Sequence, residues 1–419
     1  MDFKEYSVGQ FDTEEQKKFR KEVSGWIDAN VSPTLAQSPE ERGESADANL
    51  KDSKEFGLKL AARGWLTPSW PKEYGGAGLS ADQRHIIAEE VARRGINLPG
   101  HWANFQGGVP GPTLMKFGTD EQKKEWLPKI SKGALFALGY TEPNAGTDLA
   151  SLQMRAVGDG DDYIVNGQKM FSSGVHTADY HWILVRTNPT APKHKGISLL
   201  MADLKSPGVT IQEMHTISGM KTHEIFYDNV RVPKKNRIGP EDGGWGITRE
   251  ALSTERVSVG ASPWATKITE DLIKYAKETE RDGKPLSKDP FVRQSLAQAT
   301  IEMNILRLMN ARIGWLVDKG ESPAWTGAAS KVWEAEAGQR VANAGMQVLG
   351  LSCQLEPTSK WAPLKGRVEL GYREMVVRSF GGGSDEMMKS LIATIAMGLP
   401  REPQMAMPVK KKLFGRDAR

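Results

Sequence analysis

Cysteine is almost absent from this sequence of 419 residues, with Cys353 as its single example. One cysteine excludes an intramolecular disulfide and a zinc site built from several thiolates. The seven histidines do not supply a metal site either, because none of them forms an HExxH motif or another pair at metal-ligand spacing. The sequence therefore predicts no disulfide and no metal site.

Long apolar runs and a strong net charge are also missing. No window approaches the roughly 18 consecutive apolar residues of a membrane span. The first residues include Asp2 and Glu5 and lack the apolar core of a signal peptide. The net charge of +4 is too small and too scattered for nucleic-acid binding, and the run 410–412 of three lysines is interpreted as part of a solvated terminus. We expect a protein of the bacterial cytoplasm that binds neither a membrane nor nucleic acid.

Three segments of different hydrophobic pattern follow one another along the chain. From Thr13 to about Leu135 the pattern is helical, with Phe19, Val23 and Ile27 at four-residue spacing. Short strand-like runs come next, and a helical pattern returns after residue 243. A chain of this length is expected to form two or three domains. We expect an N-terminal helical domain over 1–135, a middle β domain over 136–240, a C-terminal helical domain over 241–402 and a basic tail over 403–419.

The individual elements follow from the same patterns. Helices are expected over Ala81–Arg94, over Trp245–Glu278 as one long element, over Pro290–Lys319 and over Ala328–Leu349, with further helix starts at Thr119 and near Ser384. Strands are expected over Trp182–Arg186, Ile197–Leu204, Val209–Met214 and Ile225–Val232. Asn166–Gly167 is interpreted as a two-residue hairpin turn.

General catalytic motifs are missing, but one acidic residue stands out. The sequence has no P-loop and no GxSxG nucleophile elbow. Glu255 has as neighbours on its helical face Ala251, Leu252, Ser258 and Val259, none of which is basic. Such a carboxylate is either exposed, or buried with a raised pKa that suits a general base. The pattern alone favours the exposed carboxylate.

Four segments carry a family resemblance. Tyr140–Asp148 reads YTEPNAGTD and resembles the TEPxAGSD signature of the acyl-CoA dehydrogenases, and Lys169–Gly174 resembles their KxWITNG segment. Gly64–Gly78 resembles the family's GWxxxxxPExYGGxG loop, and Phe226–Pro233 resembles FxDVxVP. The resemblance extends from about residue 10 to residue 400. It implies a multi-domain α and β fold with an N-terminal helical domain, a central β-barrel and a C-terminal four-helix bundle.

The resemblance also implies an enzyme that removes two hydrogens from an acyl-CoA. FAD would lie between the subunits of a homotetramer or of a mixed tetramer with a related subunit, and an electron-transfer flavoprotein would take the electrons. Tyr140 and Thr141 would line the flavin, Phe171 would lie against its face and Ser173 would bond to its edge. Without the resemblance, Thr141 and Ser173 are strand-end caps and Phe171 is a core aromatic. The implied FAD contacts are Leu138, Tyr140, Thr141, Thr147, Phe171, Ser173, Arg281, Gln294, Gln347, Gly350, Gly383, Ser384 and Asp385.

Two positions taken together imply the catalytic base. Many family members carry a glutamate in a C-terminal YEGT motif, and Gly381 stands at that position here. A subset that includes the isovaleryl- and long-chain acyl-CoA dehydrogenases places the base in an ER pair on a long helix, which Glu255–Arg256 matches. The resemblance therefore implies Glu255 as the base, with Glu386 as a weaker rival. The implied substrate contacts are Thr147, Arg256, Gly381 and Gly382.

Three departures from the family pattern leave several functions open. The RxxFGxPL segment is shortened to Arg281–Leu286, Leu351 replaces a glycine, and Leu355–Leu370 is longer and more polar than usual. Such variants resemble bacterial dehydrogenases of steroid and other bulky acyl-CoAs, some of which pair two different subunits. The leading hypothesis is a dehydrogenase of a branched, cyclic or steroid-derived acyl-CoA. The alternatives are an acyl-CoA oxidase, a non-catalytic or co-catalytic subunit of a mixed complex, and a nucleic-acid-associated relative.

Overall fold

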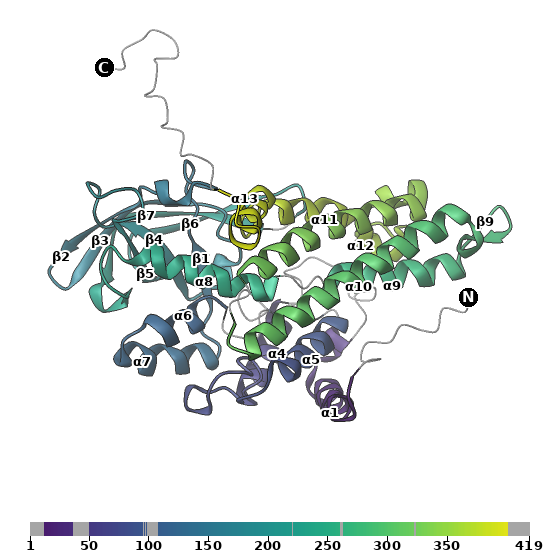
Figure 1. The fold of residues 1–419 in the computed structure, drawn as a ribbon, viewed down its shortest axis with the longest axis horizontal. Coiled ribbons are helices and arrows are strands. Elements are labelled where there is room, and N and C mark those ends of the chain that lie inside the picture. Colours follow the sequence, from purple (N-terminus) through teal and green to yellow (C-terminus); the bar gives the residue numbers. More distant parts are fainter. Residues whose placement is uncertain are drawn as a thin grey trace, which may run out of the picture.

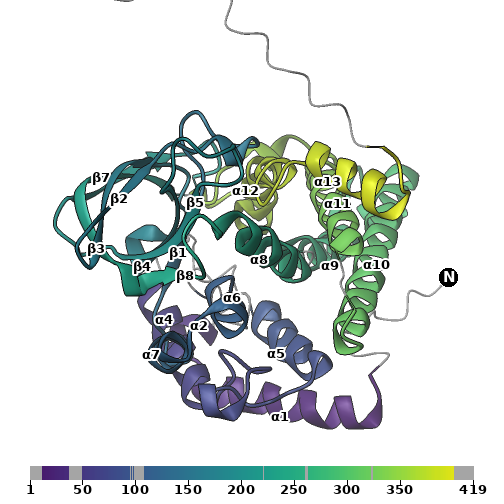
Figure 2. The ribbon, with the colours of Figure 1, turned by 60° about the vertical axis from the view of Figure 1, so that its left-hand side comes forward.

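Helices at the N-terminal end, a curled sheet in the middle and a helical bundle at the C-terminal end make up the chain (Figure 1, Figure 2). The structure is a computed structural model that describes residues 12–36, 50–94, 96, 98, 108–219, 221–259, 263–321 and 324–400. The side chains of residues 81, 253–259, 263, 317 and 318 lie outside this description, as does the expected basic tail. The order of helical, β and helical parts confirms the fold class expected from the sequence.

The N-terminal helices begin where the sequence supplies capping residues. Helices α1 (Glu14–Asn30), α5 (Ala81–Arg93) and α7 (Asp120–Ser131) each follow a Ser or Thr that forms a capping box with a Gln three residues later. The expected helix start at Thr119 is confirmed. α1 and α5 share a buried core with α4 (Leu50–Ala62). Helices α6 (Pro110–Phe117) and α7 instead bury their apolar side chains against the sheet.

The middle of the chain forms one sheet with the strand order β6-β7-β3-β2-β4-β5-β8, and β1 lies beside β4. Its strands are β1 (Phe136–Gly139), β2 (Arg155–Asp159), β3 (Asp162–Lys169), β4 (Tyr180–Arg186), β5 (Ile197–Asp203), β6 (Val209–His215), β7 (Lys221–Pro233) and β8 (Arg237–Ile238). Strands β4 to β7 confirm the four runs predicted from the sequence. The strands curl around an apolar core to which β1, β3, β4, β5 and β7 all contribute (Figure 2).

The interpretation of Asn166–Gly167 as a hairpin turn is wrong, because β3 continues through both residues. The turn between β2 and β3 contains Gly160 instead. Near Asn166 the pairing of β3 with β7 shifts between Val165 and Gly167. Gly167 has a φ of +142°, and an added Cβ would lie 2.9 Å from Met154 Cγ. The glycine therefore serves a β-bulge, which needs the same backbone freedom as a turn.

The bundle contains the long helices α8 (Gly244–Val259), α9 (Pro263–Glu278), α10 (Pro290–Asp318) and α11 (Ala324–Leu349), and α11 packs against the other three. The expectation of one helix from Trp245 to Glu278 is wrong, because the structure describes two. The second helix begins at Pro263, and proline is tolerated in the first turn of a helix but not in its interior. Short helical segments follow α11, including α12 (Arg367–Glu374), η9 (Met375–Ser379) and α13 (Asp385–Leu391). Ser384 caps α13, which confirms the predicted start of a last helix.

Helix α8 lies between the sheet and the rest of the bundle. It packs against β5 on one side and against α11 on the other. Ile247 and Ala251 of α8 are buried in the same core cluster as Trp182 and Leu199 of the sheet. A residue in the next turn of α8 therefore stands close to both parts of the chain.

Within the described ranges, none of the helices is both long enough and apolar enough to span a membrane.

Candidate functional site

The segments that follow β1 and β3 lie side by side and bring expected flavin contacts together. The backbone N–H of Met170 donates to the carbonyl oxygen of Thr141 at 2.9 Å. Lys169 Nζ donates to the carbonyl oxygen of Tyr140 at 3.2 Å. Tyr140 and Thr141 are thus tied to the turn that carries Phe171, although the two segments are far apart in the sequence.

A buried ion pair between Lys169 and Glu142 stabilises the contact between these two segments. Lys169 Nζ lies 2.8 Å from a carboxylate oxygen of Glu142, and both side chains are buried. The same carboxylate accepts the backbone N–H groups of Gln153 at 2.6 Å and Met154 at 3.0 Å. Burial lowers the pKa of Lys169 to about 8, and Glu142 opposes this shift without cancelling it. Sequence reasoning missed this pair because its members are 27 residues apart, although both belong to segments that carried the resemblance.

Phe171 is exposed and has a strained backbone. Its φ is +57°, which costs a residue other than glycine on the order of 1–3 kcal/mol, and 56% of its side chain is accessible. Its carbonyl oxygen accepts the N–H of Ser173 at 3.0 Å, and the Ser173 hydroxyl donates to Thr222 Oγ1 at 3.2 Å. A core aromatic residue would be buried. The exposure of Phe171 therefore favours the hypothesis that its ring contacts a ligand.

Two further expected contacts lie around this junction. Leu138 is partly buried in β1, where it pairs with Trp182 of β4. Thr147 is exposed in the segment between β1 and β2.

The expected contacts Gly381 to Asp385 form the turn that leads into α13. Gly382 and Gly383 have φ values of +70° and +99°, a backbone region that favours glycine. The Ser384 hydroxyl accepts the N–H of Met387 at 3.3 Å and so caps the helix. Asp385 is buried, and its carboxylate accepts Lys331 Nζ of α11 at 2.7 Å. The structure therefore gives Ser384 and Asp385 partners within the chain.

Gly381, which stands where many family members carry the base, and the rival base Glu386 both lie near this turn. At Gly381 an added Cβ would lie 3.0 Å from the carbonyl oxygen of Val377, so a side chain there would be crowded. Glu386 is exposed, and its own backbone N–H and the Ser384 hydroxyl hold the pKa of its carboxyl below the usual range. A carboxylate with a lowered pKa is a weaker base.

Arg281 lies on a tight hairpin. It belongs to β9 (Glu280–Arg281), which pairs with β10 (Lys284–Pro285). The two residues between the strands, Asp282 and Gly283, have φ values of +54° and +72°, as in a type I′ turn. The shortened RxxFGxPL segment is therefore a compact hairpin without the aromatic residue.

The structure brings Arg281 together with a second group of expected FAD contacts. Arg281 Nη2 donates to the carbonyl oxygen of Val348 at 3.1 Å, which places it beside Gln347 and Gly350 at the end of α11. Gln347 is exposed, as is Gln294 on α10. Figure 1 shows β9 at one end of the long axis of the molecule and the sheet at the other. The Arg281 group therefore lies at the end of the bundle that points away from the sheet.

Glu255 and Arg256 fall within α8, but their side chains lie outside the described part of the structure. Their backbone position is informative nonetheless. Glu255 follows Ile247 and Ala251 at four-residue spacing, and these two residues are buried against the sheet. The backbone of Glu255 therefore lies one helical turn beyond Ala251 on α8.

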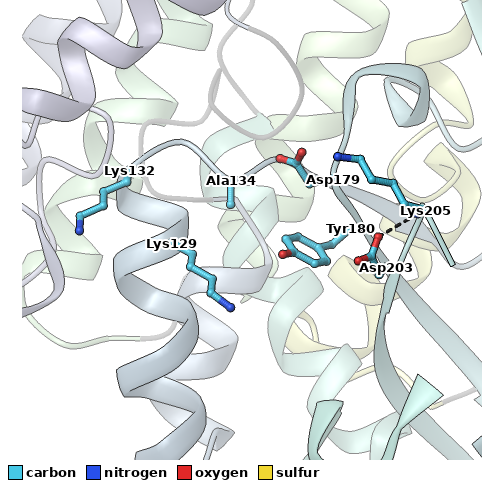
Figure 3. A pocket seen from close by; sticks show the side chains of 7 residues that line it. All are labelled: Lys129, Lys132, Ala134, Asp179, Tyr180, Asp203 and Lys205. Atoms are coloured by element: carbon cyan, nitrogen blue, oxygen red, sulfur yellow. Dashed lines mark hydrogen bonds between the residues drawn. The ribbon is translucent and has the colours of Figure 1, made fainter. Parts of the chain in front are cut away.

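A pocket of about 350 Å³ has none of the expected site residues in its lining (Figure 3). Its charged groups are largely engaged within the chain. Asp179 accepts the N–H of Leu135 at 2.9 Å, Asp203 accepts the N–H of Lys205 at 2.8 Å, and Lys129 pairs with Glu125. In the part of the chain that the structure describes, no group of His, Cys, Asp and Glu side chains is placed to hold a metal ion.

Comparison with known proteins identifies relatives along the whole chain. The family descriptions that match are "Acyl-CoA dehydrogenase, N-terminal domain" over residues 13–134, the middle domain over 137–230 and the C-terminal domain over 242–397. The chain is 37% identical over 399 residues to the acyl-CoA dehydrogenase FadE26 of Mycobacterium tuberculosis, with 93% of this chain and 98% of that protein covered.

Solved structures show the same similarity. A chain of the ChsE4-ChsE5 complex from Mycobacterium tuberculosis has a TM-score of 0.82 at 35% identity, with 95% of this chain and 100% of that chain covered. A chain of the Tcur3481-Tcur3483 steroid ACAD has a TM-score of 0.82 at 34% identity, with 96% and 100% covered.

Proposed function

The chain belongs to the acyl-CoA dehydrogenase family of oxidoreductases, and we propose that it binds FAD and oxidises the Cα–Cβ bond of an acyl-CoA to give the 2-enoyl-CoA. When bound, FAD would accept the hydride that leaves the β carbon. One observation carries the proposal: the segment of Tyr140 and Thr141 is bonded to the turn of Phe171, whose exposed ring and strained backbone suit contact with a planar aromatic ligand.

Glu255 is the proposed base that removes the α proton. The α proton of a thioester is weakly acidic, so the carboxylate has to meet it in a site from which water is excluded. The backbone of Glu255 lies where α8 passes between the sheet and the bundle. The lack of a carboxylate at Gly381 and the lowered pKa of Glu386 support this choice.

The substrate contacts have a separate task. Negative charge develops on the thioester oxygen as the proton leaves, and hydrogen-bond donors must be aimed at it. The backbone N–H of Gly381 already donates to the carbonyl oxygen of Val377 at 2.7 Å, so we assign this task to the backbone N–H of Gly382. We assign the CoA arm to Thr147 and Arg256.

A branched, cyclic or steroid-derived acyl group is the proposed substrate class. The support comes from a structural relative described as a steroid ACAD, which the chain matches along almost its whole length. The polar stretch after α11 forms short 3₁₀ segments before α12. It is longer and more polar than is usual in the family, and such variants resemble bacterial dehydrogenases of steroid and other bulky acyl-CoAs.

Assembly of subunits would complete the FAD site. Because β9 lies at the end of the bundle that points away from the sheet, we propose that the Arg281 group contacts the FAD of a neighbouring subunit, as the resemblance implies. Helix α10 offers a surface for such a neighbour, because Ile301, Leu308 and Trp315 are exposed at seven-residue spacing. We propose a homotetramer or a mixed tetramer with a related subunit, and an electron-transfer flavoprotein as the electron acceptor.

The compact hairpin at Arg281 favours a second candidate function. It lacks the aromatic residue that the family places against FAD, so the chain can depend on a related subunit for an intact set of contacts. In that case the protein is a co-catalytic subunit of a mixed complex, and Glu255 works beside FAD only in that complex. A relative solved as the ChsE4-ChsE5 complex supports this arrangement.

The visible absorption spectrum of the chain purified alone is the deciding experiment. Bound flavin that is bleached by a branched, cyclic or steroid side-chain acyl-CoA supports the dehydrogenase. Flavin that binds only after coexpression with a related acyl-CoA dehydrogenase subunit supports the co-catalytic role. A folded protein that binds no FAD in either preparation contradicts both. Reoxidation by oxygen as fast as by an electron-transfer flavoprotein would instead identify an oxidase.

A further inference from the structure

Three buried polar side chains form a hydrogen-bonded series beneath the Phe171 turn. The imidazole of His181 on β4 is fully buried, with Nδ1 2.8 Å from the Tyr227 hydroxyl and Nε2 3.1 Å from the Ser172 hydroxyl. Ser172 is fully buried as well, and Tyr227 on β7 is 3% exposed. Ser172 directly follows Phe171, so the series runs from the interior of the sheet to the strained turn.

The sequence makes room for this imidazole. His181 pairs with Ala137 of β1 on one side and with Ala202 of β5 on the other, and both neighbours are small. Gly139, two residues further along β1, is in closer contact with the ring. A Cβ on Gly139 would lie 2.3 Å from Nε2 and 2.5 Å from Cε1 of His181. A glycine at this position is therefore a condition for the histidine.

Charge and burial decide how the series is bonded. Burial, assisted by the nearby ammonium of Lys169, lowers the pKa of His181 to about 3, so the ring is neutral near pH 7. A neutral imidazole has one N–H donor and one acceptor nitrogen. Burial also raises the pKa of the Tyr227 hydroxyl, which stays protonated and can donate to Nδ1. Each of the two hydroxyls can donate or accept, so a neutral imidazole can satisfy both links at the same time.

Two hydrogen bonds of Ser172 hold the turn that contains Phe171. The Ser172 side chain is bonded to His181, and its backbone N–H donates to the carbonyl oxygen of His223 at 3.2 Å. A left-handed Phe171 persists only if its surroundings fix it. The two bonds of the adjacent residue provide that constraint, because the turn cannot relax without leaving a buried polar group unpaired.

We propose that His181 and Tyr227 are positioning residues that, through Ser172, fix the turn Phe171–Ser173 and with it the ring of Phe171 at the flavin. The inference rests on the proposed function for the identity of the ligand, but the effect on the turn is a property of the chain alone. It differs from a purely structural role of buried polar groups, in which their loss lowers stability without a specific effect at Phe171.

Tyr227→Phe and Ser172→Ala break the series at its two ends, and Tyr163→Phe is the matched control. Tyr163 is also a buried tyrosine of the same core cluster, but its hydroxyl accepts Arg237 at 2.6 Å and is no part of the series. Two readouts are needed: amide hydrogen exchange over residues 170–174 in protein without FAD, and the dissociation constant and visible absorption band of bound FAD.

We expect both series variants to accelerate exchange in the turn and to weaken FAD binding, each by about tenfold, the loss that corresponds to one buried hydrogen bond. The flavin absorption band should shift as the ring of Phe171 moves. The control should change neither readout, whatever its effect on stability. The inference is overturned if Tyr227→Phe and Tyr163→Phe behave alike at the turn. Ser172→Ala decides the matter if Tyr227→Phe does not fold. Failure of the wild-type protein to bind FAD would count against the proposed function only, because the exchange readout still tests the turn.

Discussion

Lys331 of α11 and Asp385, the first residue of α13, form a buried ion pair with 2.7 Å between Nζ and Oδ1. Asp385 comes directly after Ser384 and the turn of Gly382 and Gly383, so the pair connects this turn to the central helix of the bundle. A buried ion pair contributes little net stability, but it fixes the position of its partners as long as both are present. The turn expected to contact the substrate is thereby held from the bundle side.

Replacing Lys331 by methionine should be severely destabilising. Lys331→Met leaves the Asp385 carboxylate buried without its cation, and the loss expected from such a change is about 3–5 kcal/mol in the free energy of unfolding. Lys389→Met is the matched control, because Lys389 pairs with Glu336 at the exposed surface of the same two helices. The control should lose less than about 1 kcal/mol. Equal losses in urea unfolding would mean that Asp385 finds another partner.

Glu334, one turn along α11 from Lys331, should make stability fall with rising pH. Its carboxylate is buried and has no hydrogen-bond partner among the described residues, and the nearest cation is Arg378 with 3.9 Å between Nε and Oε1. Burial therefore raises the pKa of Glu334 above its ordinary value of 4.5. A carboxyl with a raised folded pKa binds more protons when folded, so its contribution is largest at low pH and is lost as pH rises above 4.5.

Glu334→Gln should remove this part of the pH dependence. Unfolding free energies between about pH 5 and pH 8 should decrease less in the variant than in the wild type. Glu336→Gln is the matched control, since hydrogen bonding to Lys389 lowers the pKa of Glu336 below 4.5, and this variant should keep the wild-type slope in that pH range. A wild-type curve that coincides with that of Glu334→Gln would show that the carboxylate is solvated or paired.

Glu255→Gln should leave FAD bound but abolish its reduction by substrate. The amide keeps the shape of the side chain and cannot accept the α proton, so the rate of flavin bleaching by an acyl-CoA should fall by about 10²–10⁴-fold. Glu250→Gln is a control on the same helix, where Glu250 pairs with Lys116 at the surface. Stopped-flow absorbance of the anaerobic enzyme measures both rates. Bleaching of Glu255→Gln at the wild-type rate would remove Glu255 from the mechanism.

Local patterns in the sequence predicted the elements whose causes are local. The capping residue Thr119 and the four strand-like runs of the sheet act through neighbours in the chain, and they were assigned correctly. The bulge at Gly167 depends on where β7 lies, and the division of the predicted long helix into α8 and α9 goes with Pro263 in the first turn of α9. A glycine in a strand-like run and a proline after a helical pattern each indicate a break in the element. They do not predict whether the break is a turn, a bulge or the end of a helix.

The candidate site shows the same division. Motif positions such as Thr141 and Phe171 were assigned through their resemblance to a family, and the structure brings them together. The groups that hold them in place were missed, because His181 and Tyr227 come from strands 46 residues apart and look in the sequence like ordinary strand residues. The close contact between Gly139 and the His181 ring, which only the structure shows, explains why a glycine is needed beside this histidine.

Leu308→Asp should separate the subunits and release FAD at the same time. Leu308 is the most exposed member of the apolar stripe on α10, at 70%, and a carboxylate there would be buried without a partner in a helix–helix interface. Because the Arg281 group is proposed to contact the FAD of a neighbouring subunit, these contacts are lost when the interface opens. Light scattering with in-line flavin absorbance should show smaller species with little flavin. Val157→Asp, on an exposed apolar residue of β2, should keep both size and flavin. A Leu308→Asp protein that keeps its size would place the interface elsewhere, and one that separates but retains FAD would show that a single chain binds the cofactor unaided.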